Sequence, residues 1–217
     1  MDVAVVDIGR PGKNLGWWIA GPNRCEGNDD IDCCIEVLAS VLREGPLALG
    51  FEAPLFVPKR DDPSKLLKAR EGECTYRVNR PFSAGAGAVV LVAALVVVPY
   101  ILSKLKTAVP NVKGTFDWYS KLSEPGETQF FEAFVTNQGS RSDTRHVDDA
   151  RLAVAAFQRG MCRPEEFNSS IDEPNCFNLL GAMLLRTGWT DDLGRPLTPV
   201  LSGQRIDCDC CGGQGFA

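Results

Sequence analysis

Short apolar runs and one amphipathic segment organise the first quarter of the chain. The segment from Asp32 to about Arg43 repeats its apolar positions every three or four residues and stops at Gly45-Pro46, which predicts a helix capped by Asp32. The apolar runs predict buried strands at 3–8, 16–20 and 47–51, and the Gly-rich turn between the first two predicts a hairpin. A strand–helix–strand crossover favours parallel pairing, so we expect the third run to pair with the first.

After residue 51, the sequence pattern predicts more helices than strands. One strand is expected at 130–135, and helices are expected at 64–72, 148–159 and 175–186. After Gly188, the residues Gly, Pro, Asp and Cys dominate and predict loops with at most one edge strand. We therefore predict an α/β fold, with one domain over 1–187 and a C-terminal extension over 188–217.

The residues 81–103 carry no charge, and a run of this length qualifies as a membrane-span candidate. The run is rich in Gly, Ala and Val, Pro99 interrupts it, and the chain has no comparable second run. A bilayer here would also separate the acidic residues near the N-terminus from those near 148. We therefore expect a helix from Gly85 to about Leu102 that is buried on all sides, and no membrane.

Net charge and cysteine content narrow the class of protein. A net charge of −5 argues against a protein that coats nucleic acid non-specifically. A protein with this charge can still bind a short stretch of nucleic acid through a local basic patch. The nine cysteines are not preceded by a secretory leader, so we expect reduced thiols in a cytoplasmic protein. Cys208, Cys210 and Cys211 do not match the paired spacing of a zinc site, and a tail of reduced thiols is the simpler interpretation.

Acidic residues stand where predicted strands end and where a helix begins. Asp7 and Glu52 end two apolar strands, and Asp148 and Asp149 open the helix at 148–159. Acids at the ends of neighbouring buried strands meet at one edge of a sheet, where they repel one another unless a cation joins them. A hard divalent ion such as Mg²⁺ suits such a site, because it prefers oxygen ligands and keeps waters for chemistry.

Most of these acids also have a plainer explanation, but Glu52 does not, because Glu is a poor turn former and is rarely unpaired at a strand end near the core. Asp7 can cap its turn, and Asp148 and Asp149 can cap the helix and complement its dipole. Glu132 lies inside an apolar strand, where its charge either faces solvent or points into a site. Together, these acids favour a site over a set of independent caps.

Several motifs resemble the ribonuclease H-like superfamily. Within it, the chain looks most like the DUF429-type predicted nucleases and shares features with Holliday-junction resolvases of the RuvC type. The resemblance covers about residues 3–157. Its motifs are Asp7-Ile8-Gly9 followed by Gly16-Trp17, then Gly50-Phe51-Glu52-Ala53-Pro54-Leu55, then Asp149-Ala150 opening an Ala-rich helix.

The resemblance implies a ribonuclease H-like mixed sheet flanked by helices, with two Mg²⁺ or Mn²⁺ ions bound by acids. The equivalent metal ligands would be Asp7, Glu52 and Asp149, with Asp148 as the near alternative. The implied activity is hydrolysis of phosphodiester bonds in nucleic acid by a two-metal mechanism. The chain departs from the pattern in two respects, because no third strand is evident after Ala20 and Glu132 has no equivalent.

A local excess of basic residues follows Glu52. Between Lys59 and Arg80 there are seven basic residues against four acids. Guanidinium groups suit phosphate oxygens, so the predicted phosphate-binding residues are Arg60, Arg70, Arg77 and Arg80. The alternative is a solvated face with local ion pairs.

His146 is the only histidine of the chain and lies three residues before Asp149. It can act as a proton shuttle at the site, or it can be an ordinary loop histidine. The sequence thus predicts a metal-dependent nuclease with Asp7, Glu52, His146, Asp148 and Asp149 as candidate catalytic residues. The alternative is a catalytically degenerate ribonuclease H-like binding or scaffold protein. A phosphotransferase of the actin and sugar-kinase type would need a duplicated half, which 217 residues cannot hold.

Overall fold

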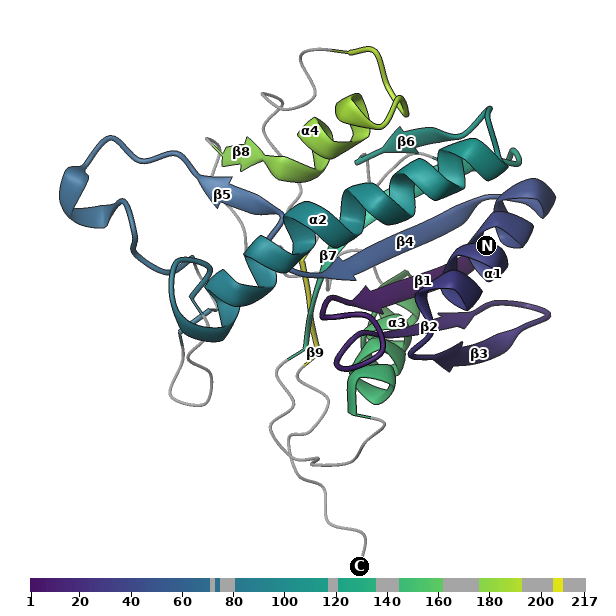
Figure 1. Cartoon of the computed structure of the whole chain (residues 1–217), viewed down its shortest axis with the longest axis horizontal. Coiled ribbons are helices and arrows are strands. Elements are labelled where there is room, and N and C mark those ends of the chain that lie inside the picture. Colours follow the sequence, from purple (N-terminus) through teal and green to yellow (C-terminus); the bar gives the residue numbers. More distant parts are fainter. Residues whose placement is uncertain are drawn as a thin grey trace, which may run out of the picture.

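The computed structural model describes residues 1–70, 73–74, 81–116, 121–135, 145–161, 176–192 and 205–208. Its centre is a mixed sheet in the order β3-β2-β1-β4-β7-β6, and β9 also pairs with β7 (Figure 1). Every strand of the sheet runs parallel to β1 except β2. The strands are β1 (Asp2–Asp7), β2 (Gly16–Ala20), β3 (Cys25–Asn28), β4 (Leu47–Glu52), β6 (Lys113–Thr115), β7 (Glu127–Val135) and β9 (Arg205–Cys208).

Helices cover both faces of this sheet. One face packs against α1 (Ile31–Glu44), α2 (Gly85–Ala108) and α4 (Leu179–Arg186), and the other packs against α3 (Arg145–Met161). A separate two-stranded sheet joins β5 (Phe56–Pro58) to β8 (Cys176–Asn178). The predicted α/β class is confirmed, and the strand order with its flanking helices agrees with a ribonuclease H-like arrangement.

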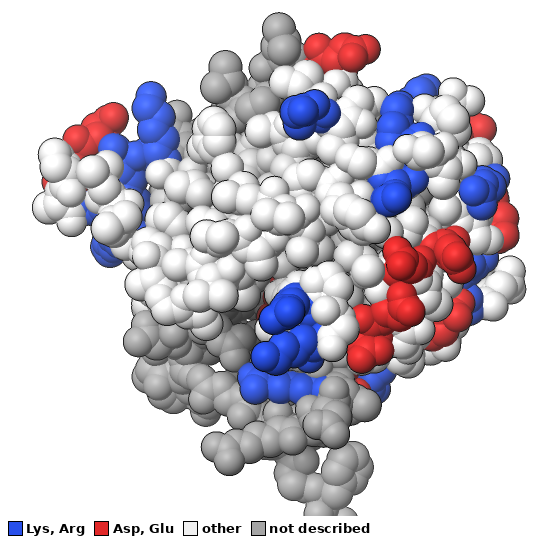
Figure 2. Space-filling view, in the orientation of Figure 1, with Lys and Arg blue, Asp and Glu red and all other residues white. Residues whose placement is uncertain are grey.

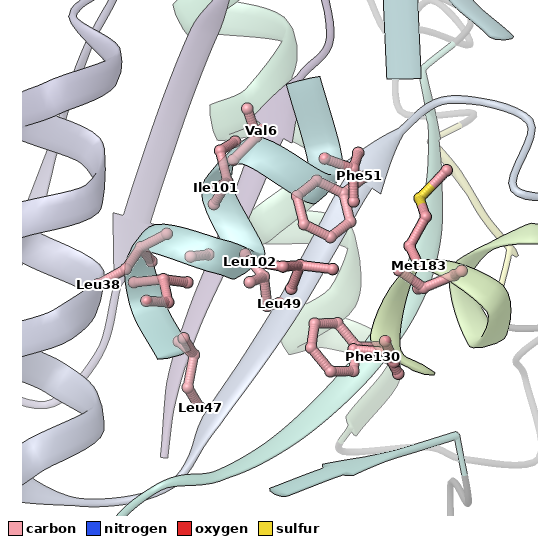
Figure 3. Packing of buried hydrophobic residues seen from close by; sticks show 14 of the residues in the cluster. Val6, Leu38, Leu47, Leu49, Phe51, Ile101, Leu102, Phe130 and Met183 are labelled. Atoms are coloured by element: carbon pink, nitrogen blue, oxygen red, sulfur yellow. The ribbon is translucent and has the colours of Figure 1, made fainter. Parts of the chain in front are cut away.

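The alternation of side chains along the strands builds the larger core. Val6, Leu49 and Phe51 point to the face that α1 and α2 cover (Figure 3). Ile101 and Leu102 of α2 pack against these strand residues, and both are fully buried. This layer fixes α2 along the face of the sheet, and the first turns of the helix, at Ala86, Gly87 and Val90, line the pocket described below.

The opposite face of the sheet has a smaller core under α3. Phe131 of β7 and Phe157 of α3 lie with ring centroids 4.2 Å apart, and both are fully buried. Gly50 of β4 is the neighbour of Phe131 across the sheet, and a Cβ at Gly50 would come within 2.3 Å of the Phe131 ring. The absence of a side chain at Gly50 therefore makes room for this aromatic pair.

Most of the predicted elements are confirmed. The hairpin of the first two strands and the parallel pairing of β1 with β4 are both present. The third strand, which the sequence after Ala20 does not make evident, exists as β3, and it is short and largely polar. The cap of α1 is Asp30 rather than Asp32, because the Asp30 carboxylate accepts hydrogen bonds from the N–H groups of Asp32 and Cys33.

Three helix predictions need correction in detail. The helix predicted over 175–186 begins only at Leu179, because Cys176–Asn178 form the strand β8. The segment predicted as a helix over 64–72 contains a single turn of 3-10 helix, η1 (Pro63–Lys65), within its described part. The predicted uncharged helix is confirmed as α2, which continues past Pro99 to Ala108. The prediction that it is buried on all sides is wrong, because Val89 and Val96 are 69% and 70% exposed. This helix is long and apolar enough to cross a bilayer, as some core helices also are.

Most of the predicted extension over 188–217, including Cys210 and Cys211, lies outside the described residues. Residues 205–208 form β9, so part of this stretch adds a strand to the central sheet. Five cysteines in the described part of the chain are free thiols: Cys25, Cys33, Cys34, Cys74 and Cys176.

Candidate functional site

Two acids meet at the ends of adjacent parallel strands. Asp7 ends β1 and Glu52 ends β4, and the two residues are direct partners in the strand register. Both line a pocket of about 220 Å³ at this edge of the sheet. The predicted meeting of these acids at one edge is therefore present in the fold, because parallel strands in register bring their carboxyl ends together.

The first turn of α3 brings two more polar side chains to Asp7. His146 Nδ1 lies 2.7 Å from Asp7 Oδ2. Asp149 follows one turn later on the helix, and its side chain is 12% exposed. Ligand atoms of Asp7, His146 and Asp149 all lie within 4.8 Å of one another. Asp148, the near alternative, does not line the pocket and instead lies 3.4 Å from Arg151.

A glycine explains how α3 reaches β1 so closely. Gly16 of β2 is the register partner of Asp7, and a Cβ on Gly16 would lie 2.4 Å from backbone atoms of both His146 and Val147. Any side chain at Gly16 would push the start of α3 away from the sheet. The Gly16-Trp17 motif therefore acts on the site by permitting the contact between His146 and Asp7.

The contact with Asp7 changes the acid–base chemistry of His146. The hydrogen bond to Asp7 raises the pKa of the imidazole, partial burial lowers it, and the charges of Asp7 and Asp149 add to the rise. The net effect is a pKa above the ordinary histidine value. In the absence of a metal, a proton on His146 thus takes the position between the imidazole and the carboxylate.

The pocket as a whole is suited to a cation. Four carboxylates line it, against the two guanidinium groups of Arg70 and Arg145 and one imidazole. Arg145 Nε lies 3.7 Å from Asp149 Oδ2, and the Arg145 side chain is 37% exposed. The remaining wall is largely apolar and is formed by Ile8, Ala53, Pro54, Ala86, Gly87 and Val90. The side of the pocket with the carboxylates can therefore bind a cation, while the apolar side can contact an uncharged part of a ligand.

Arg70 belongs to a buried network at the side of the pocket. Its guanidinium donates to both carboxylate oxygens of Glu132, at 3.0 and 2.7 Å, and to Glu73 Oε1 at 2.8 Å. The side chains of all three residues are at most 1% exposed. Glu132, whose role the sequence left open, is thus aimed at Arg70 beside the site rather than at solvent.

Backbone groups complete this network. Arg70 Nη1 also donates to the carbonyl of Phe56, and Glu132 accepts from the N–H of Leu55. Glu73 accepts from the N–H of Phe82, just before α2. The network therefore ties the loop after Glu52 and the segment before α2 to β7, and holds two walls of the pocket together.

Of the four predicted phosphate-binding arginines, the structure describes Arg60 and Arg70, and Arg70 lines the pocket. The donors of Arg70 already bind protein oxygens, and the Arg60 guanidinium donates to carbonyl groups of its own loop at Lys65, Lys68 and Ala69. Arg77 and Arg80 lie outside the described residues. The phosphate-binding role of these four residues stays a prediction, and the geometry favours a structural role for Arg70.

Two features of the pocket were not predicted from the sequence. They are Arg145 and the apolar wall that α2 contributes. Arg145 and Asp149 are four residues apart, so an i,i+4 pattern at the start of a helix was available as a signal. The apolar wall from α2 carried no such signal, because its position depends on how the helix packs over the sheet.

A scan against protein-family models finds no matching family, and searches of curated proteins and of solved structures find no match either. Agreement with the ribonuclease H-like arrangement therefore rests on the strand order alone, and membership of the DUF429-type family stays a prediction.

The chemistry of the donor groups fits a divalent cation. Two carboxylates and one imidazole offer the oxygen and nitrogen ligands that Mn²⁺ and similar ions accept, whereas Mg²⁺ prefers oxygen throughout. The cluster with atoms in mutual reach is Asp7, His146 and Asp149, while Glu52 lies beside it in the same pocket. This cluster has His146 in the place that the predicted ligand set gave to Glu52.

Proposed function

We propose that the protein is a metal-dependent nuclease that hydrolyses phosphodiester bonds at the pocket between β1, β4 and α3. The observation that carries this proposal is the cluster of Asp7, His146 and Asp149, whose ligand atoms lie within 4.8 Å of one another at the sheet edge. The strand order and the net negative lining of the pocket also support it.

The residues take distinct roles in this proposal. Asp7, His146 and Asp149 would hold one divalent cation, and Glu52 beside Asp7 would help to hold a second. The bound ions would stabilise charge on the phosphoryl oxygens and make a water more acidic. Mn²⁺ is the preferred ion because of the imidazole ligand, with Mg²⁺ as the weaker alternative.

The rest of the pocket would position the substrate. Arg145, partly exposed at the pocket, is the cation best placed to orient a phosphate group. The apolar wall of Pro54, Ala86 and Val90 would receive a base or a sugar. The protein is expected to act in the cytoplasm on nucleic acid.

Cleavage assays with Mn²⁺ and with Mg²⁺ test this proposal on single strands, duplexes, RNA–DNA hybrids and branched DNA. Asp7→Asn and Asp149→Asn should lower the rate at least about 100-fold and remove metal binding in calorimetry. Asp148→Asn is the matched control, since it removes a carboxylate from the same helix turn outside the pocket. Its rate should stay close to that of the wild-type protein.

Arg145→Gln separates substrate binding from metal binding. It should weaken nucleic-acid binding and reduce the slope of affinity against salt by about one, while metal affinity should not fall, because the variant removes a positive charge beside Asp149. Metal binding without cleavage of any of these nucleic acids would contradict the nuclease and favour the binding or scaffold alternative. Absence of metal binding in the wild-type protein would contradict the metal site itself.

A further inference from the structure

The side of α2 that faces away from the domain is apolar. Half of the large apolar side chains that are exposed in the described residues belong to this one helix. They are Val89, Val92, Leu95, Val96 and Tyr100, with between 43% and 70% of their surface exposed. Figure 2 shows an unbroken uncharged surface over α2, with Lys, Arg, Asp and Glu only around its margins.

The residue types on this face stabilise neither the helix nor the solubility of a monomer. Valine loses side-chain freedom in a helix, and at Val89, Val92 and Val96 little packing within the described residues offsets that loss. A solvated helix face normally carries Lys, Glu, Gln or Arg, which favour the helix and keep the surface soluble. The composition therefore indicates a contact surface.

We propose that this face of α2 is the interface of a homodimer, in which it packs antiparallel against the same face of a second copy. The stripe Val89, Val92, Val96 and Tyr100 follows the three-and-four spacing of a single helix face. A two-fold axis between positions 94 and 95 places Val92 against Val96 of the other copy, and Val89 against Tyr100. Each contact then occurs twice, as an isologous interface requires.

The properties of the face favour a second copy over other occupants. It is uncharged, so two identical faces meet without electrostatic repulsion, and antiparallel helices also align their dipoles favourably. Complete burial of these five side chains would remove roughly 500 Å² per copy, or about 1,000 Å² in the dimer, which is the lower bound for a specific interface. A strongly charged partner such as nucleic acid has no complementary group on this stripe.

A bilayer fits this face less well. The inner side of α2 is held in the core by Ala94, Val98 and Ile101, which are fully buried, so the helix cannot leave the domain to span a membrane. A helix that lies in the membrane plane usually carries several Lys or Arg residues along its own polar face. The only charged residues of α2 itself are Lys104 and Lys106, and both follow the last residue of the stripe.

Sedimentation velocity on the full chain, from about 1 to 100 µM, tests the proposal. The wild-type chain of 23.6 kDa should sediment as a dimer over this range. Val92→Glu and Val96→Lys should each raise the dissociation constant at least about tenfold, since each buries two uncompensated charges. The double variant Val92→Glu/Val96→Lys should restore the dimer, because each Glu then faces a Lys across the antiparallel contact.

Leu67→Glu is the control, because it places the same charge on an exposed apolar side chain outside α2. It should leave the dimer unchanged. A monomeric wild-type chain, or a dimer that tolerates Val92→Glu, overturns the proposal. Failure of the double variant to restore association overturns the antiparallel register. A monomer that sediments with vesicles of phosphatidylcholine and phosphatidylglycerol would identify a lipid surface as the occupant and also overturn it.

Discussion

The imidazole of His146 lies 2.7 Å from the carboxylate of Asp7, across 139 residues of sequence. This contact joins the first turn of α3 to the end of β1, and Asp149 comes within reach of the same carboxylate. The two elements share no local sequence signal for the contact. The distance therefore depends on how closely α3 packs onto β1 and β2, which Gly16 decides.

The first prediction concerns pH. Because the hydrogen bond to Asp7 raises the pKa of His146 in the folded state, the folded protein binds this proton more tightly than the unfolded chain does. The stabilisation is fully present below the unfolded histidine pKa of about 6.5, and it is lost as the pH rises through the higher folded value. Denaturant unfolding of the metal-free protein should show this loss, and His146→Gln should remove it.

NMR titration gives an independent reading of the same group, since His146 is the only histidine of the chain. Its imidazole should titrate above the ordinary histidine value in the wild-type protein and closer to that value in Asp7→Asn. An imidazole that titrates below 6.5 in the wild-type protein would contradict the contact with Asp7.

The second prediction concerns Gly16. Gly16→Ala places a Cβ 2.4 Å from the backbone of His146 and Val147, so the start of α3 must move. We expect Mn²⁺ affinity to fall by about tenfold and the free energy of unfolding to fall by about 1–3 kcal/mol. Calorimetry and denaturant melts measure the two effects. Gly45→Ala is the control, because a Cβ there meets nothing within 4 Å and its backbone is extended.

The third prediction concerns the buried network. Glu132→Gln removes the charge that the Arg70 guanidinium binds with two hydrogen bonds in a fully buried position. We expect the free energy of unfolding to fall by about 3 kcal/mol, because the positive charge of Arg70 loses one of its two carboxylate partners. Glu44→Gln removes a carboxylate from an exposed ion pair with Arg24 and should change stability little. Equal effects of the two substitutions would contradict the buried pairing.

The fourth prediction concerns the core under α3. Gly50→Ala places a methyl group against the buried Phe131 ring and should cost about 1–3 kcal/mol of folding free energy. Phe131→Leu in the same chain should recover part of this loss, because the smaller side chain makes room for the methyl group. The stability losses of Gly50→Ala and Phe131→Leu can be added to give the loss expected without a clash between the two side chains. If the double variant loses more than this sum, the clash is elsewhere.

The sequence was informative wherever local pattern decides structure. Apolar runs located β1, β2 and β4, and the amphipathic repeat located α1, because burial of one face fixes these periods. The strand β3 was missed because it has no run of large apolar residues and none of its residues is buried, so it pairs through its backbone without an apolar signal. The exposed side of α2 was missed because an apolar composition on all sides does not say which side faces the core.

For the site, the sequence by itself determined that Asp7 and Glu52 share one sheet edge, because adjacent parallel strands bring their carboxyl ends together. The tertiary structure alone decided which other groups join them. Packing of α3 turned His146 and Asp149 toward Asp7 and left Asp148 outside the pocket, while folding of the loop after Glu52 paired Arg70 with Glu132. Contacts between residues more than 60 positions apart depend on how whole elements pack, and no local periodicity encodes that packing.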